Sequence, residues 1–168
     1  KIHTGHSEPR HHRSEVDLPE LVAMGRARAI PTIEYLANGA LIDLSRYGLP
    51  REPVVAERLA LGADVVIVSA DTLMGGPQAG LVVGTAVCAG AMGHNGLQRA
   101  LQCGKLTIAA LEATLRLYRE SACIAQDIPT LRAWTRPLRE IEDTAQRALP
   151  ALISALGPGF QLSVQDEM

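Results

Sequence analysis

The chain has 168 residues, of which 47% are hydrophobic and 20% are charged, with a formal net charge of -2. This length and composition are typical of an ordinary globular domain with a real hydrophobic core. The charge gives no global electrostatic case for nucleic-acid binding, so DNA is not an expected partner, and no apolar run is long enough to span a membrane.

The first 16 residues are polar and contain His3, His6, His11 and His12. Clustered histidines are typical of metal sites, but no cysteine or carboxylate lies at a helpful ligand spacing. We therefore read this region as a loop and expect no metal. Cysteines elsewhere are odd in number and lack metal spacing, which predicts reduced thiols and a cytoplasmic protein.

A helix is predicted to follow, with Asp17 as its cap, Pro19 in its first turn and Glu20 completing an Asp-x-x-Glu box. Pro31 ends this helix, and residues 32–36 form the next strand. The expected buried side of the helix comprises Leu18, Leu21, Val22, Gly25 and Ala29.

The middle of the chain alternates helix and strand. An irregular loop over residues 44–53 leads to a predicted helix over 54–61 and then to Val65–Val68, a β-branched run typical of a strand buried on both faces. A further apolar run covers residues 81–83. This order predicts an α/β fold with a mostly parallel sheet and helices on its faces.

Polar residues follow the buried strand at its carboxyl end, where open α/β sheets usually bind ligands. Ser69, Asp71 and Thr72 occupy this tip, and a loop rich in glycine, residues 75–80, returns the chain. Glycine in such a loop allows a ligand to approach the backbone closely. The tip is therefore the candidate site.

Several helices are predicted in the C-terminal half. Small residues fill 86–93, a short helix covers 96–102, and Thr107 is a plausible cap for a packing helix that contains Leu106, Leu111, Leu115 and Tyr118. A crossing segment over 128–137 leads to a long helix over 138–156, and residues 160–165 read as a lone strand. The first residue is lysine, and we expect a segment of a longer protein.

Two motifs carry a resemblance to a known family. Ser69-Ala-Asp-Thr-Leu-Met-Gly-Gly-Pro-Gln-Ala-Gly80 and Lys105-Leu-Thr-Ile-Ala-Ala-Leu-Glu-Ala-Thr-Leu-Arg-Leu-Tyr118 resemble segments of bacterial selenocysteine synthase, the L-seryl-tRNA(Sec) selenium transferase family of fold-type-I pyridoxal-phosphate (PLP) enzymes. The resemblance implies the second part of the PLP-transferase large domain over residues 1–128. It also implies a crossing helix and the start of a small α/β C-terminal domain over 129–168.

The same resemblance implies where the cofactor would sit. The family reads Ser-Gly-Asp-Lys where this chain has Ser69-Ala-Asp71-Thr72, so Thr72 takes the position of the lysine that forms the PLP Schiff base. Tyr35 takes the position of the aspartate that pairs with the PLP ring nitrogen. Glu34 is adjacent, but strand alternation points it to the opposite face. Because threonine cannot form an imine, we do not expect PLP to be held covalently.

The remaining site residues are also carried over from the family. Ser69, Gly75, Gly76 and Gln78 fall at cofactor-binding positions. In the short helix, Arg99 matches the first of two arginines that suit an anionic substrate, whereas Gln102 replaces the second.

The function implied by the resemblance is PLP-dependent conversion of seryl-tRNA(Sec) to selenocysteinyl-tRNA(Sec) by a homo-oligomer. The loss of the lysine and the aspartate predicts a member with impaired or lost catalysis, acting as a binding or assembly subunit. The alternative is an active PLP-dependent transferase or lyase of this group whose lysine comes from elsewhere, such as Lys105 or a partner chain. tRNA is an expected partner through the family alone.

Overall fold

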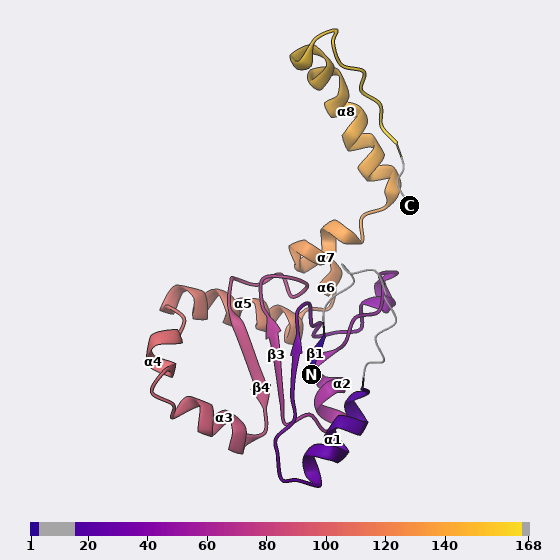
Figure 1. Ribbon diagram of the computed structural model, residues 1–168. Coiled ribbons are helices and arrows are strands. Elements are labelled where there is room, and N and C mark those ends of the chain that lie inside the picture. The colour runs from indigo at the N-terminus through magenta and orange to yellow at the C-terminus, as the bar shows by residue number, and fades with distance from the viewer. Residues whose placement is uncertain (4–15, 166–168) are drawn as a thin grey trace.

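The computed structural model describes residues 1–3 and 16–165, and its elements are labelled in Figure 1. A four-stranded sheet lies at its centre, in the order β1-β2-β3-β4. The strands are β1 (Ile2–His3), β2 (Ile33–Leu36), β3 (Val65–Ser69) and β4 (Gly80–Gly84).

The first three strands run parallel, and β4 runs antiparallel to β3. A parallel pair needs a crossover, which α1 (Leu18–Arg26) supplies between β1 and β2, and α2 (Val55–Ala60) supplies between β2 and β3. The short return loop after β3 leaves no room for a crossover, so β4 is antiparallel. The predicted mostly parallel α/β sheet is confirmed.

One face of the sheet carries the main core. Leu36, Val66 and Val68 are buried on this face and cluster with Leu18 of α1 and Val55 of α2. Burial of these aliphatic side chains is the main force that holds α1 and α2 against the strands. The opposite face is more open: Ile2, Ile33, Tyr35 and Val82 are exposed along it.

A second, smaller core lies beyond the carboxyl ends of the strands. It joins Ala40 and the 3₁₀ helix η1 (Leu44–Tyr47) to α6 (Ile124–Asp127) and α7 (Pro129–Trp134). Its buried members are Ala40, Leu44, Ile124, Ile128 and Leu131. The residues that pack with Ala40 and η1 therefore extend to Leu131. The domain boundary at residues 128/129 stays a prediction.

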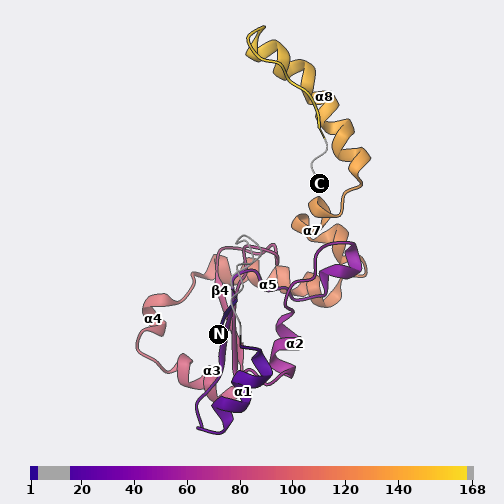
Figure 2. The ribbon, with the colours of Figure 1, turned by 45° about the vertical axis from the view of Figure 1, so that its right-hand side comes forward.

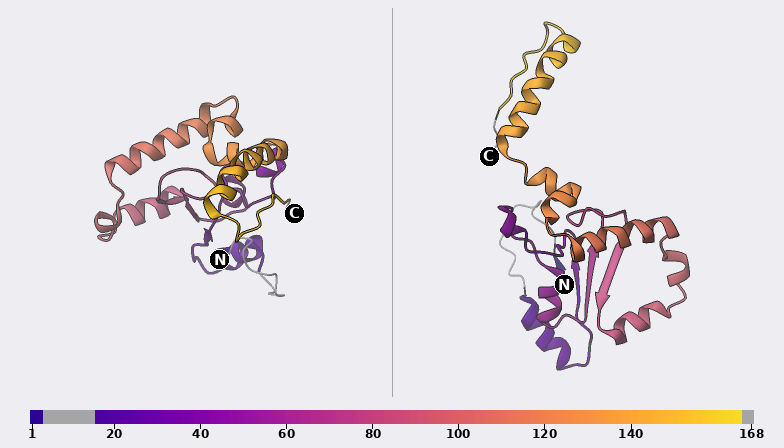
Figure 3. Two further views of the ribbon diagram at one scale, coloured as in Figure 1. Left: turned by 90° about the horizontal axis from the view of Figure 1, so that it is seen from above. Right: turned by 180° about the vertical axis from the view of Figure 1, so that it is seen from behind.

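Three helices form an arch beside β4: α3 (Ala86–Gly93), α4 (Gln98–Leu101) and α5 (Lys105–Glu120). Figure 3 shows from behind that α5 returns from this arch across the edge of the sheet where β3 ends and β4 begins. The last helix, α8 (Leu138–Leu156), projects away from the sheet, and the following residues run back along it (Figure 2).

Several sequence-based boundaries were wrong. Helix α1 ends at Arg26, and Ala29 is exposed with a φ of 52°, because the chain turns before β2. Asp17 is the N-cap residue, but its side chain makes no capping hydrogen bond.

Further corrections concern the C-terminal half. Gly104, not Thr107, is the N-cap of α5, and Leu106 on that helix is exposed. Residues 86–93 are helical, with the Thr85 hydroxyl accepting from the Cys88 amide at 3.4 Å. Residues 160–165 form no strand, because they lie along α8, away from the sheet.

Within the residues that the structure describes, no helix is long and apolar enough to cross a membrane, and no group of metal-ligating side chains is found. His6, His11 and His12 of the histidine-rich stretch lie outside the described residues.

Candidate functional site

The tip of β3 is built by a compact set of backbone hydrogen bonds. The Ala70 amide donates to the Ala79 carbonyl at 2.9 Å, and the Gly76 amide donates to the Ala70 carbonyl at 2.7 Å. These bonds close the loop over residues 71–79 on itself. The candidate site thus stands on a fixed strand end, because the two ends of its loop are tied together.

Glycine is required at one position of this loop. Gly75 has a φ of +68°, and a Cβ there would lie 2.9 Å from the Thr130 hydroxyl and 3.1 Å from the Ile128 side chain. The left-handed backbone and the close approach of α7 both disfavour any side chain. The loop therefore packs directly against the second core.

Helix α5 secures the same loop from another side. The Tyr118 hydroxyl donates to the Met74 carbonyl at 3.1 Å, and the Met74 side chain is fully buried. Burial raises the pKa of the Tyr118 phenol to about 12, because it disfavours the phenolate. Tyr118 therefore stays protonated at neutral pH and keeps donating.

The polar residues of the tip divide into two kinds. Asp71 is exposed and accepts a 2.5 Å hydrogen bond from the Ser69 hydroxyl. Thr72 is partly buried, and its Oγ1 atom is buried without a hydrogen-bond partner among the described residues. An unpaired buried hydroxyl is costly, so Thr72 is the unusual group of the tip.

Strand register brings Tyr35 toward this tip. Tyr35 pairs with Ile67, and Ser69 lies two residues further along β3, so Tyr35, Ile67 and Ser69 share the more open face of the sheet. Tyr35 is 43% exposed. The structure thus gathers Tyr35, Ser69, Asp71 and Thr72 around one end of two neighbouring strands.

Glu34 faces the other way, as strand alternation predicts. It is fully buried, and its carboxylate accepts two hydrogen bonds from the Arg58 guanidinium, both 2.7 Å long. The bond to Glu34 raises the pKa of Arg58. Sequence reasoning missed this ion pair because 24 residues separate its members. The available signal for a buried ion pair was a charged residue, Glu34, at a strand position that points inward.

The two residues at the predicted substrate-anion positions lie elsewhere. Arg99 is on α4 and Gln102 follows it, both exposed, at the turn of the arch away from the β3 tip (Figure 1). Gln78 is exposed on the loop, and Gly76 is close-packed because a Cβ there would lie 3.0 Å from the Ala70 carbonyl oxygen. The structure places Gly75, Gly76 and Gln78 at the tip, and Arg99 and Gln102 apart from it.

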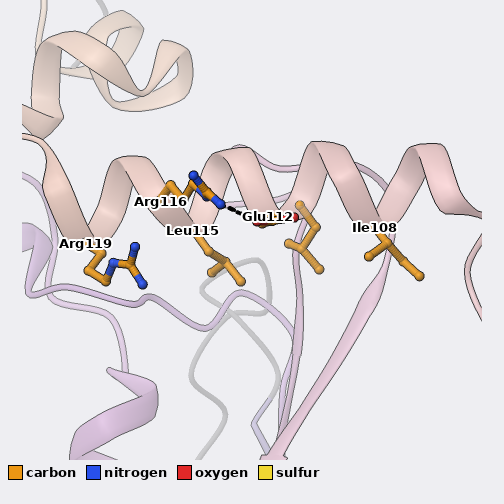
Figure 4. Close-up of a pocket in the computed structure, with 6 residues that line it drawn as sticks. Ile108, Glu112, Leu115, Arg116 and Arg119 are labelled. Carbon is orange, nitrogen blue, oxygen red and sulfur yellow. Dashed lines mark hydrogen bonds and ion pairs between the residues drawn. The ribbon is translucent and has the colours of Figure 1, made fainter.

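A groove of about 370 Å³ runs along α5, as Figure 4 shows. Leu115, Ile108 and Arg119 line it, and Arg116 pairs across one turn with Glu112 at 2.7 Å. None of the predicted site residues lines this groove, so the sequence prediction does not account for it.

The donor set of the tip does not fit a Schiff base to PLP. The groups present are hydroxyls, a carboxylate and a phenol, and imine formation requires an amine. The sequence contains two lysines, Lys1 and Lys105. Lys105 begins α5, and Tyr118, which touches the loop, lies 13 residues later, roughly 20 Å along the helix at 1.5 Å per residue.

Comparisons with known proteins bear on the fold and the family. One solved structure, D-glucosaminate-6-phosphate ammonia-lyase, superposes with a TM-score of 0.53 at 22% identity, over 71% of this chain and 29% of that chain. This likeness concerns the fold, and it agrees with the fold-type-I α/β segment expected from the sequence.

Relatives of known name are closer in sequence. The L-seryl-tRNA(Sec) selenium transferase of Methylocella silvestris is 44% identical over 165 residues, which are 98% of this chain and 35% of that protein. The proteins of the same name from Serratia proteamaculans and Klebsiella pneumoniae are 42% and 45% identical, over 98% and 90% of this chain and 36% and 33% of their own length. The chain spans about a third of the length of these relatives. The family model SelA, L-seryl-tRNA selenium transferase, matches residues 1–168, so the chain belongs to this family.

Proposed function

We propose that this protein is a selenocysteine-synthase-like member that has lost the covalent PLP chemistry of its family and acts as a binding or assembly subunit. The observation that carries the proposal is the hydroxyl of Thr72 at the β3 tip, buried and without a hydrogen-bond partner among the residues that the structure describes, at the position where the resembling family has its lysine. A hydroxyl there removes imine formation while the surrounding fold is kept.

The geometry of Tyr35 supports the same conclusion. A phenol on the open sheet face replaces the aspartate expected at the PLP ring nitrogen, and the adjacent carboxylate on β2, Glu34, is turned inward and engaged by Arg58. A ring nitrogen near Tyr35 would therefore lack a carboxylate from either position. Two functions of the site, covalent capture and ring protonation, are lost together.

The second candidate is an active PLP-dependent transferase or lyase that uses another lysine. Among the described residues Lys105 lies at the far end of α5 from the loop, so this candidate favours a lysine presented by a second chain. Incubation with PLP, borohydride reduction and peptide mass analysis distinguish the candidates. We expect no reduced PLP adduct, whereas a specific adduct on Lys105 would support the second candidate.

A gain-of-function experiment tests the site more sharply. In a full-length chimera, with the rest of the sequence from the Methylocella silvestris relative, Thr72→Lys with Tyr35→Asp is expected to restore the internal-aldimine absorbance. Either change alone should do less, because one group makes the bond and the other tunes it. Gln146→Lys on exposed α8 controls for non-specific capture. A double variant that binds PLP no better than the parent would contradict our placement of Thr72 and Tyr35.

The partners follow from the family. We propose tRNA as the macromolecular partner, with Arg99 as a candidate contact for anionic groups, since the relatives are named for a reaction on L-seryl-tRNA(Sec). Cys88, Cys103 and Cys123 are free, in keeping with the proposed cytoplasmic location. In a filter-binding assay, we expect the Arg99→Gln variant to lose tRNA retention and the Arg116→Gln variant to keep it.

Self-association is the last part of the proposal. The open sheet face exposes Ile2, Ile33, Tyr35 and Val82 side by side on neighbouring strands, an apolar surface that a monomer rarely leaves uncovered. We expect light scattering to report a homo-oligomer. A monodisperse monomer at high concentration would contradict this.

A further inference from the structure

A pocket of about 450 Å³ lies at the elbow between α7 and α8, where the projecting helix joins the body. We call it the elbow pocket. Its polar lining comprises Gln126, Arg132, Thr135, Arg136 and Glu140, and Pro129 and Pro137 form stiff parts of its wall. Two guanidinium groups and one carboxylate give the lining a net positive charge.

Arg132 is available to a ligand. It is exposed on α7, and its side chain makes no ion pair or hydrogen bond to any other residue in the described part of the chain, although its backbone amide donates to the Ile128 carbonyl within the helix. Helix α7 is itself anchored, because Leu131 beside it is fully buried in the second core. A free guanidinium on a fixed helix is suited to bind an anion, since it offers five donors in a planar fork.

Arg136 is held in place from the other side of the pocket. It donates to the Glu140 carbonyl and to the Thr144 hydroxyl, both at 3.2 Å, and its Nε lies 3.7 Å from the Glu140 carboxylate. The last contact is longer than a hydrogen bond, and both side chains are substantially exposed. Arg136 is therefore positioned but not neutralised by a close partner.

A third cation approaches the same point. The Thr144 hydroxyl also accepts a hydrogen bond from Arg147, at 3.1 Å. Two guanidinium groups thus share one neutral acceptor, and like charges at such short separation repel each other. An anion placed at Arg136 would relieve that repulsion.

We propose that the elbow pocket binds a phosphate group, free or esterified, through Arg132 and Arg136. The ligand bridges the end of α7 to the start of α8 and so fixes the direction in which α8 projects. A compact, doubly charged oxyanion fits because Arg132 can donate two hydrogen bonds to it through its planar fork. Arg136, whose Nη2 atom already donates to Glu140 and Thr144, donates to the ligand through its Nη1 atom.

Trp134 makes the proposal easy to test. It is the one tryptophan of the sequence, and it lies between Arg132 and Arg136. The full chain is titrated with inorganic phosphate, and separately with AMP, at low and constant ionic strength against a chloride control. Calorimetry and Trp134 emission are followed together. We expect saturable heat and an emission change with both phosphates, because low salt preserves the attraction between exposed charges.

Single substitutions inside and outside the pocket test where the phosphate binds. Arg132→Gln and Arg136→Gln should each weaken phosphate binding by roughly tenfold, the loss expected for charge-assisted hydrogen bonds. Arg139→Gln, on the same helix as Glu140 but outside the pocket lining, is the matched control and should bind as the parent does. Glu140→Gln should bind more tightly, because it removes the one negative charge of the pocket.

Three results would overturn the proposal. They are the absence of saturable binding beyond chloride, equal weakening by Arg139→Gln and Arg132→Gln, and binding of AMP without binding of inorganic phosphate. Circular dichroism on each variant confirms that α8 is retained, so that a loss of binding is assigned to the side chain.

Discussion

The buried ion pair between Glu34 and Arg58 offers the sharpest test of how this fold positions its site. Both Glu34 oxygens accept 2.7 Å hydrogen bonds, the Glu34 side chain is fully buried, and the Arg58 side chain is 19% exposed. The pair fixes which face of β2 points inward, and so keeps the neighbouring Tyr35 on the open face.

Arg58→Met leaves a carboxylate buried without its partner, and the expected loss in the free energy of unfolding is about 3–5 kcal/mol. This corresponds to a fall in Tm of roughly 6–20 °C for a chain of this size. Glu34→Gln should cost less, because Arg58 still reaches water. Urea unfolding followed by circular dichroism measures both losses.

Two further variants make this test decisive. Glu34→Leu with Arg58→Met removes both charges and should recover much of the loss, since a pair replaced by apolar groups is often neutral. Arg116→Gln breaks an exposed pair, 61% exposed on each side, and should cost about 0.3–0.5 kcal/mol. Equal losses for Arg58→Met and Arg116→Gln, or a double variant no more stable than Arg58→Met alone, would refute the reasoning.

Three other outcomes follow from the loop at the β3 tip. Gly75→Ala should lower the free energy of unfolding, measured with a chemical denaturant, by about 1–2 kcal/mol, because the left-handed backbone of Gly75 and its contact with Thr130 both oppose a side chain. Gly80→Ala is the control, because a Cβ at Gly80 meets nothing within 4 Å. Equal losses in the two variants would contradict this role of Gly75. Tyr118→Phe should cost about 1 kcal/mol through the lost bond to Met74, and an unchanged unfolding midpoint would count against that bond. Because the folded pKa of Tyr118 is raised from 10.0 to about 12, its contribution is complete below pH 10 and is lost as pH rises from 10 to 12. The unfolding free energy of the parent should therefore fall over that interval relative to that of Tyr118→Phe, which has no phenol to ionise at this position.

Local sequence determined the framework of this protein. The β-branched run before Ser69 predicted a buried strand, and the glycines after it predicted a tight return of the chain, because both signals depend on neighbouring residues alone. The helix over 138–156 was also readable, since Gly157 ends it where the apolar pattern stops. One family motif covers the end of β3 and its glycine-rich loop, and the other lies on α5, so the family could be predicted from the sequence too.

Only the tertiary structure decided how distant residues meet. The pairing of Glu34 with Arg58, the contact of Tyr118 with Met74 and the approach of Thr130 to Gly75 join segments 24 to 55 residues apart, and no local pattern encodes them. The ends of α1 and α5 were misjudged for the same reason: the turn at Ala29 and the start of α5 at Gly104 depend on where the chain must go next. The elbow pocket exists because α7 is buried in the body while α8 leaves it, an arrangement set by packing rather than by spacing in the sequence.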